Sequence, residues 1–209
     1  MVRSSHLRTT HHISRKQASN SRPAILLAEK LGTPLNQVVS INFTAQEVDE
    51  HQICSILTRL RARYCRWAKS PGKRRPGKPY EPAMIWVMEN TGHHACHLMM
   101  YVPADRVANF RAELSKWIEK ESGRELAAGT LDIRPAYNPH GFRKYMLKGI
   151  DPLFAGLYRI RHVPQGAVQG KRFGYTQNLG PSQCRKNGTK KPYRWPRRDS
   201  ASGQAASPF

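Results

Sequence analysis

Two short apolar runs separated by a turn constrain the fold of this chain more than any other feature. Residues 83–89 and residues 95–102 each have the length and composition of a single strand. Asn90, Thr91 and Gly92 lie between them, and asparagine and glycine favour a tight turn because both tolerate positive φ angles. We therefore expect an antiparallel β-hairpin at this position.

The segments before and after the hairpin alternate between strand and helix patterns. Residues 37–44 and residues 131–135 alternate apolar and polar side chains, which indicates strands. Over residues 45–67 apolar side chains recur at helical spacing, behind Thr44 and Glu47, which together offer a capping box. We expect the first helix to begin directly after the first strand.

Two further helices complete the predicted order. Apolar residues at helical spacing between Pro103 and Gly123 predict the second helix. Asn138 and Pro139 predict the start of the third, which ends near Gly149. The order is strand, helix, hairpin, helix, strand, helix, which is typical of an α+β fold with helices packed on an antiparallel sheet.

Both ends of the chain are basic and poor in apolar residues. We expect residues 1–34 to form a flexible basic arm, apart from a short helix over residues 22–31. Residues 35–152 form the predicted folded domain, and residues 153–209 a basic, partly disordered extension. The 209-residue chain has 35 Lys and Arg against 14 Asp and Glu, a net charge of +21, which predicts a polyanionic partner.

The apolar segments are too short for a membrane span, which needs about 18–20 residues. The first 21 residues are polar and basic and contain no apolar stretch of a secretory signal. We expect a cytoplasmic protein without a membrane partner. The four cysteines lie far apart and form no Cys-x-x-Cys pair, which indicates reduced thiols.

The densest chemical feature is a carboxylate and three histidines around the hairpin turn. Glu89 ends the first strand, and His93, His94 and His97 follow the turn. Imidazole nitrogens and a carboxylate oxygen together suit a divalent ion such as Mn²⁺, Zn²⁺ or Mg²⁺, although Mg²⁺ prefers oxygen ligands. As the cofactor we expect Mn²⁺ or Mg²⁺ before Zn²⁺. Two alternatives are a polar hairpin rim facing solvent and a small zinc protein that also uses Cys96. The zinc alternative is the weakest, because adjacent residues cannot wrap a tetrahedral ion.

Tyr145 and Lys148 are the candidate catalytic residues. They are three positions apart in the third predicted helix and therefore lie on one face. An ammonium group beside a phenol favours its ionised, nucleophilic form and neutralises a phosphate under attack. The alternative is an ordinary amphipathic helix surface.

Basic residues in four segments are the candidate DNA contacts. Those in the tail are interspersed with aromatic side chains, a mixture suited to phosphate contact and base stacking. The predicted DNA-binding residues are Arg74, Arg75, Arg143, Lys144, Lys171, Arg172, Arg194, Trp195, Arg197 and Arg198.

These features together resemble the HUH endonucleases, single-tyrosine enzymes that start rolling-circle replication of plasmids and phages. In that family an early strand precedes His-hydrophobe-His on a central strand, and Tyr-x-x-Lys follows on a later helix. Residues 40–44, Glu89, His97, Tyr145 and Lys148 have the same order here. The resemblance covers about residues 38–150.

The resemblance implies a ferredoxin-like or RRM-like palm that nicks and rejoins single-stranded or hairpin DNA. Tyr145 would attack the scissile phosphate, giving a 5′-phosphotyrosyl intermediate, with Lys148 beside it. Glu89, His94 and His97 would hold the divalent metal, with His93 as the substitute ligand. A bacterial host would supply a helicase and a polymerase as further partners.

One position departs from the family pattern. Ala95 stands two residues before His97, where the family has its first histidine. His94 would share the face of His97 only through a bulge next to Gly92. The alternative is a non-catalytic DNA- or RNA-binding protein that keeps the same fold.

Overall fold

The computed structural model describes residues 8–70 and 78–190, and within them a five-stranded antiparallel sheet forms the centre of the fold. Its strand order is β5-β2-β4-β3-β7. A second, two-stranded sheet pairs β1 with β6. The strands are β1 (Thr9–Thr10), β2 (Gln37–Asn42), β3 (Met84–Asn90), β4 (His94–Met100), β5 (Leu131–Pro135), β6 (Val168–Gln169) and β7 (Phe173–Tyr175).

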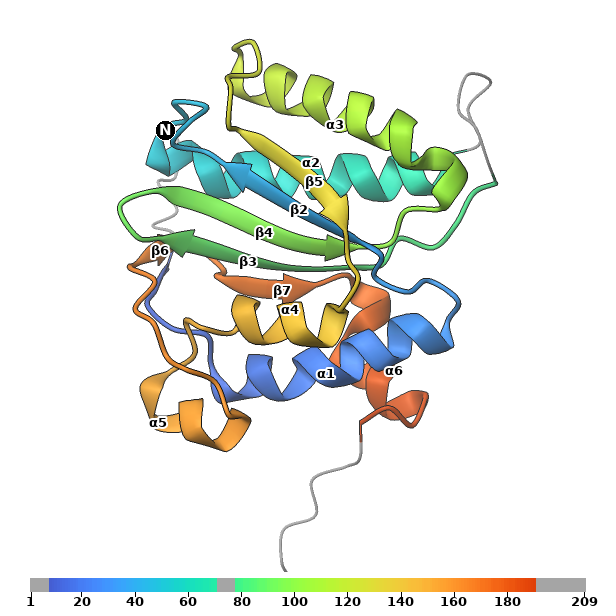
Figure 1. Cartoon of the computed structure of the whole chain (residues 1–209), viewed down its shortest axis with the longest axis vertical. Coiled ribbons are helices and arrows are strands. Elements are labelled where there is room, and N and C mark those ends of the chain that lie inside the picture. The colour runs from blue at the N-terminus through green and yellow to red at the C-terminus, as the bar shows by residue number, and fades with distance from the viewer. Residues whose placement is uncertain (1–7, 71–77, 191–209) are drawn as a thin grey trace, which may run out of the picture.

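Helices cover both faces of the large sheet. In Figure 1, α2 and α3 lie on one face, and α1, α4 and α6 lie on the other. Within the described ranges, no helix is long and apolar enough to cross a membrane. The helices are α1 (Arg15–Lys30), α2 (Glu50–Lys69), α3 (Val107–Ser122), α4 (Pro139–Met146), α5 (Pro152–Ala155) and α6 (Pro181–Lys186), with short 3₁₀ turns at Ala104–Arg106, Gly156–Tyr158 and Gln177–Leu179.

The central part of the chain has the β-α-β-β-α-β order of a ferredoxin-like fold. β2, α2, β3, β4, α3 and β5 follow one another, and their strands lie in the order β5-β2-β4-β3. The predicted α+β class, the hairpin and the helices after Pro103 and Asn138 are thus confirmed. β7 adds a fifth strand beside β3.

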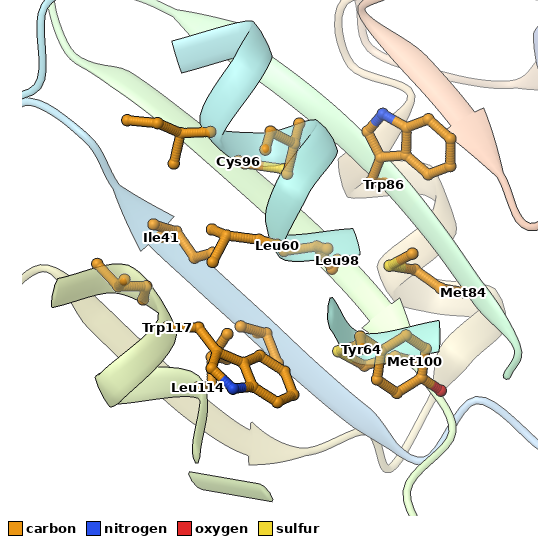
Figure 2. Close-up of a cluster of buried hydrophobic side chains, with 14 of the residues drawn as sticks. Ile41, Leu60, Tyr64, Met84, Trp86, Cys96, Leu98, Met100, Leu114 and Trp117 are labelled. Atoms are coloured by element: carbon orange, nitrogen blue, oxygen red, sulfur yellow. The ribbon is translucent and has the colours of Figure 1, made fainter. Parts of the chain in front are cut away.

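Alternating side chains give the sheet two apolar faces. In β4, Cys96, Leu98 and Met100 pack with α2 and α3, as Figure 2 shows. Met99, from the same strand, packs with residues of α1 and α4 on the opposite face. Even-numbered side chains of β4 therefore point toward α2 and α3, and odd-numbered ones toward α1 and α4.

Of the predicted arm over residues 1–34, the structure describes residues 8–34, and there the prediction of flexibility is wrong: the short helix predicted over residues 22–31 is the second half of a longer helix, α1. α1 begins with a capping box in which Ser14 and Gln17 bond each other's backbone N–H groups. Ala24, Ile25 and Leu27 of this helix are fully buried against the sheet. Burial of this face offsets the conformational entropy that the segment loses on ordering. The apolar surface that covers it belongs to the sheet, whose strands lie far along the chain.

The predicted domain boundary at residue 152 is also wrong. β7 pairs with β3 through Phe173 opposite Val87, and Cys184 of α6 is buried in the same core as α1. Gly174 lets β7 approach, because a Cβ there would lie 2.2 Å from an atom of the Trp86 ring. The segment over residues 153–190 is therefore part of the folded domain.

The first central helix begins later than predicted. The side chain of Thr44 accepts a hydrogen bond from the backbone N–H of His94 (2.8 Å), so it fixes the hairpin and caps no helix. Glu47 has a φ of 52° and lies in a turn. Asp49 is the N-cap of α2 and accepts from the backbone N–H of His51 (2.8 Å).

Candidate active site

The register of the hairpin places Glu89 and His97 on the same face of the sheet. Val87 pairs with His97, and Glu89 pairs with Ala95. Odd-numbered residues of both strands point toward α1 and α4, as Val87 and Met99 show. His97 Nε2 lies 3.4 Å from Glu89 Oε2, so a pair of diagonal neighbours forms the floor of the site.

α4 places Tyr145 over this floor. The helix begins at its N-cap Asn138, whose side chain accepts from the backbone N–H of Gly141 (2.7 Å). Met146, next to Tyr145, is buried in the core, and this anchor leaves Tyr145 on the outer side at 43% exposure. The Tyr145 hydroxyl lies 3.3 Å from His97 Nε2, so an accessible phenol meets an imidazole.

Phe142 and Ser40 hold these two rings in place. The Phe142 ring stacks on Tyr145, one helical turn away, at 5.3 Å between centroids. Ser40 lies opposite His97 in the β2–β4 pair, and its hydroxyl is 2.9 Å from His97 Nδ1. In the tautomer with a proton on Nδ1, the ring donates to Ser40 and Nε2 can accept from Tyr145; with a proton on Nε2, the ring can instead donate to Glu89 Oε2 at 3.4 Å.

Lys148 completes the site through an ion pair with Glu89. Its Nζ is 2.9 Å from Glu89 Oε2 and 3.9 Å from the centroid of the Tyr145 ring. Burial raises the pKa of Glu89, but hydrogen bonds and charges from His97 and Lys148 outweigh it, so this pKa lies below its ordinary value. Burial lowers the pKa of Lys148, yet its contacts with Tyr145 and Glu89 outweigh that loss and raise this pKa. Both groups are therefore charged near neutral pH.

The predicted metal ligands do not come together. The β3–β4 register is continuous from Asn90 and His94 onward, so there is no bulge to turn His94 toward His97. His94 lies on the α2 side, 3.4 Å from the carboxylate of Glu50, and His93 is exposed in the turn. Within residues 8–70 and 78–190, no group of three His, Cys, Asp or Glu side chains could hold a metal ion.

The four residues of the alternative zinc site also do not converge. Cys96 points into the core with α2 and α3, and burial raises the pKa of its thiol. His97 lies on the opposite face of the same strand. Adjacent strand residues point to opposite faces, so these side chains cannot surround one ion.

The side chains around Glu89 and His97 do not fit a divalent ion held by the protein. One carboxylate and one imidazole are present, and the third neighbour is the ammonium of Lys148. Ala95, which pairs with Glu89, has no side-chain atom that could coordinate a metal ion. Among the described residues Glu89 Oε1 is buried without a hydrogen-bond partner, and one free oxygen does not make a metal site. We derive no chemical step through a metal ion.

Arg172, predicted to contact DNA, has a structural role instead. Its side chain is fully buried and donates to the carbonyl oxygens of Met88 (3.1 Å), Gln165 (3.1 Å) and Thr10 (3.2 Å), and to that of Gly166. The guanidinium joins three chain segments, so Arg172 stabilises the fold. Its neighbour Lys171 is exposed.

Arg143 and Lys144 lie beside a basic hollow on the other side of α4. Together with Arg22 and His140 they line a cavity of about 410 Å³. Arg143 is half-buried and donates to the hydroxyl of Ser21 (3.3 Å). Burial, and then the charge of Arg22, lower the pKa of Arg143. Two guanidinium groups that line the same hollow favour an anion between them.

The other predicted DNA contacts lie outside the residues that the structure describes. They are Arg74, Arg75, Arg194, Trp195, Arg197 and Arg198. Two residues that hold the site had no assigned role before the structure, Ser40 and Phe142. The spacing of Phe142 and Tyr145 is a signal that could have identified one of them, whereas the partner of Ser40 depends on strand register.

Comparisons with known proteins add no family to this description. Models of protein families give no match to the chain, and searches of curated proteins and of solved structures give none either.

Proposed function

We propose that the protein is an endonuclease and strand transferase that nicks and rejoins single-stranded DNA through a covalent bond to Tyr145. The observation that carries the proposal is the contact of the exposed Tyr145 hydroxyl with His97 Nε2 at 3.3 Å. A nucleophile within hydrogen-bond reach of a base, which a third group orients, is the arrangement that activates a hydroxyl. Ser40 is the orienting group, at 2.9 Å from His97 Nδ1.

The proposed reaction exchanges one phosphodiester for another. His97 accepts the proton of the Tyr145 hydroxyl while the phenolic oxygen attacks phosphorus. A bond forms between this oxygen and phosphorus, and the bond from phosphorus to the 3′-oxygen breaks. The 3′-oxygen leaves with the electron pair and takes up a proton, which balances the one lost by the phenol. A 5′-phosphotyrosyl link and a free 3′-hydroxyl result, and the reverse reaction rejoins the strand.

Positive charge on two sides of α4 supports phosphate as the substrate group. Lys148, held by Glu89 at 2.9 Å, lies where it can stabilise charge that develops on the attacked phosphate. Arg22, Arg143 and Lys144 line the hollow on the other side and suit a neighbouring phosphate of the same strand. Glu89 acts through Lys148 and His97 and is a positioning residue.

The proposed partners follow from the reaction. A free 3′-hydroxyl is a primer, so a polymerase and a helicase of a bacterial host would act after the nick. The net charge of +21 suits a DNA partner. In a bacterium this places the protein in the cytoplasm.

Formation of a covalent adduct tests the proposal. The full chain is incubated with internally labelled single-stranded circular DNA and with 3′-fluorescent hairpin DNA, in Mn²⁺, in Mg²⁺ and with a chelator, and run on a denaturing gel. We expect an adduct with the parent protein and none with Tyr145→Phe. Tyr137→Phe is the matched control, because Tyr137 is 91% exposed and eight residues away, and it should form the adduct normally.

Comparison of the reactions with Mn²⁺, with Mg²⁺ and with the chelator tests whether Lys148 supplies the positive charge that the reaction needs. Because the positive charge beside the phenol belongs to Lys148, we expect the adduct to persist with the chelator. If no adduct forms with any substrate or metal, or if Tyr145→Phe still forms one, the proposed reaction is wrong.

A second candidate function is nucleic-acid binding without catalysis. The finding in its favour is that Ala95 stands beside Glu89 and that His94 lies on the other face of the sheet. Under this alternative, DNA binds tightly, no adduct forms, and Tyr145→Phe binds with unchanged affinity. Adduct formation distinguishes the two functions.

A further inference from the structure

A groove far from Tyr145 in the fold has a composition that the proposed reaction does not use. It has a volume of about 770 Å³ and lies between α2 and the edge strand β7, and we call it the α2–β7 groove. Its charged, aromatic and amide lining residues include Arg61, Lys171, Trp86, Tyr175 and Asn178. Trp86 belongs to the core on the α2 and α3 face, and Figure 2 shows it at the border of that cluster. Tyr145, by contrast, lies on α4, which covers the opposite face.

Two cations in the groove have no acidic partner among the residues that the structure describes. The Arg61 guanidinium lies 3.9 Å from the centroid of the Trp86 ring, and Lys171 Nζ lies 5.4 Å from the same ring. Within the described ranges neither side chain forms a salt bridge. The one carboxylate of the lining, Glu81, is paired with Lys69 at 3.2 Å.

The environment of these cations favours a bound anion. Burial lowers the pKa of Arg61, and burial and then the charge of Arg61 lower the pKa of Lys171. Arg61 Nε is buried and without a hydrogen-bond partner among the described residues. Two like charges in a partly desolvated groove repel each other, and an anion between them removes the repulsion.

An aromatic ring and an amide lie next to the cations. Tyr175 is half-buried, and Lys171 Nζ is 5.7 Å from its ring centroid. Within the described part of the chain, Asn178 Nδ2 is buried without a hydrogen-bond partner. The Tyr175 ring packs on the core on the α1 side and also lines the groove. A ring that lines a groove offers a stacking platform for a base, and an amide donor suits the edge of a base or a phosphate oxygen.

We propose that the α2–β7 groove binds a nucleotide unit of a single nucleic-acid strand. Arg61 and Lys171 hold the phosphodiester, and the base lies against Tyr175 with Asn178 at its edge. The volume of about 770 Å³ accommodates a ligand of this size. An acidic peptide would satisfy the cations but would leave the aromatic platform unused, so the strand is the better fit. This site shares no residue with the Tyr145 site, and its test does not depend on catalysis.

The test measures the affinity and salt dependence of strand binding. Anisotropy of a fluorescent oligothymidylate is recorded over a salt series with the full chain carrying Tyr145→Phe, which prevents cleavage. Into this background we place Lys171→Gln or Tyr175→Leu. Lys116→Gln is the matched control, because Lys116 is an exposed lysine of α3 (69% of its side chain) that does not line the groove.

The expected result is specific to the groove. Lys171→Gln should raise the Kd about tenfold, as expected for one charge-assisted contact, and reduce the slope of log K against log salt by about 0.7. Tyr175→Leu should raise the Kd about tenfold with an unchanged slope, because stacking involves no counterion. Lys116→Gln should change neither quantity. Urea unfolding of each variant verifies that it is folded.

Three outcomes would overturn the proposal. Groove variants that bind like the Lys116→Gln control would show that no strand enters the groove. Polyglutamate of equal charge that competes as well as the oligonucleotide would show an unspecific cation surface. Thymidine monophosphate that competes at the concentration of the oligonucleotide would show a site for a free nucleotide. The two proposals can fail separately. If the parent protein forms no adduct through Tyr145 but the groove variants bind DNA more weakly than the control, the proposed reaction is refuted and the groove proposal stands.

Discussion

The ion pair of Glu89 and Lys148 leads to a sharp stability prediction. Glu89→Gln keeps the shape of the side chain and removes its charge, so the Lys148 ammonium loses its counter-ion. The exposed fractions are 7% for the Glu89 side chain and 19% for that of Lys148, with 2.9 Å between their charged atoms. The variant therefore leaves a charge in a place that water reaches poorly.

The expected cost follows from this burial. Breaking a buried pair by removing one partner costs about 3–5 kcal/mol. Because 19% of the Lys148 side chain stays exposed, water compensates part of the loss, and we expect the lower end, about 3 kcal/mol. The matched control is Glu81→Gln, whose pair with Lys69 has exposed fractions of 65% and 57%. That variant should cost at most about 1 kcal/mol.

The pH dependence gives a second check on the same variant. The pKa of Glu89 is lowered in the folded protein, so its contribution is fully present above the ordinary value of about 4.3 and is lost as the pH falls through the folded pKa. The pKa of Lys148 is raised, so its contribution is present below about 10.4 and is lost as the pH rises through the folded pKa. The difference between parent and variant is therefore largest between about pH 5 and pH 10.

Urea unfolding followed by tryptophan fluorescence measures these differences. Parent, Glu89→Gln and Glu81→Gln are compared at pH 7 and at several acidic values. The reasoning is refuted if Glu89→Gln costs no more than the control at pH 7. It is refuted equally if its cost stays constant down to the lowest pH at which the parent is folded.

Two further predictions concern the base and the buried arginine. His97→Gln should slow adduct formation about a hundredfold or more, the usual contribution of a general base, and Ser40→Ala about fivefold, the value of one neutral hydrogen bond. Single-turnover gels measure both rates, and equal rates for His97→Gln and the parent would contradict the role of His97. Arg172→Met should lower the free energy of unfolding by about 3 kcal/mol, because it leaves the carbonyl oxygens of several segments unpaired. Its folded fraction should bind DNA like the parent, and weaker binding would contradict the structural role of Arg172.

Local patterns were sufficient for the central part of the fold. The hairpin, the strand over Leu131–Pro135 and the helix that ends before Gly123 all follow from periodicity and turn chemistry. Gly123 itself has a φ of 71°, the left-handed conformation that ends a helix readily with glycine. These features depend on neighbouring residues, and their signals therefore lie within a few positions of each other.

Features that depend on residues far away in the sequence were predicted wrongly. The first part of α1, over residues 15–21, reads as a polar arm because its buried residues are small or polar, namely Ala18, Asn20 and Ser21, and such residues give no apolar pattern in the sequence. Arg172 reads as a surface cation because its carbonyl partners are supplied by three other segments. Thr44 has the spacing of a helix cap, but its hydroxyl oxygen instead accepts a hydrogen bond from the backbone N–H of His94 in the hairpin.

The sequence by itself determined that a carboxylate, a histidine, a tyrosine and a lysine lie on elements of an α+β fold. Only the tertiary structure decided which of them meet. Strand register sends His97 to the face of Tyr145 and His94 to the face of Glu50, because a shift of one residue reverses the direction of a side chain. Packing of α4 on the sheet then brings Lys148 to Glu89, a contact between residues 59 positions apart that no local pattern specifies.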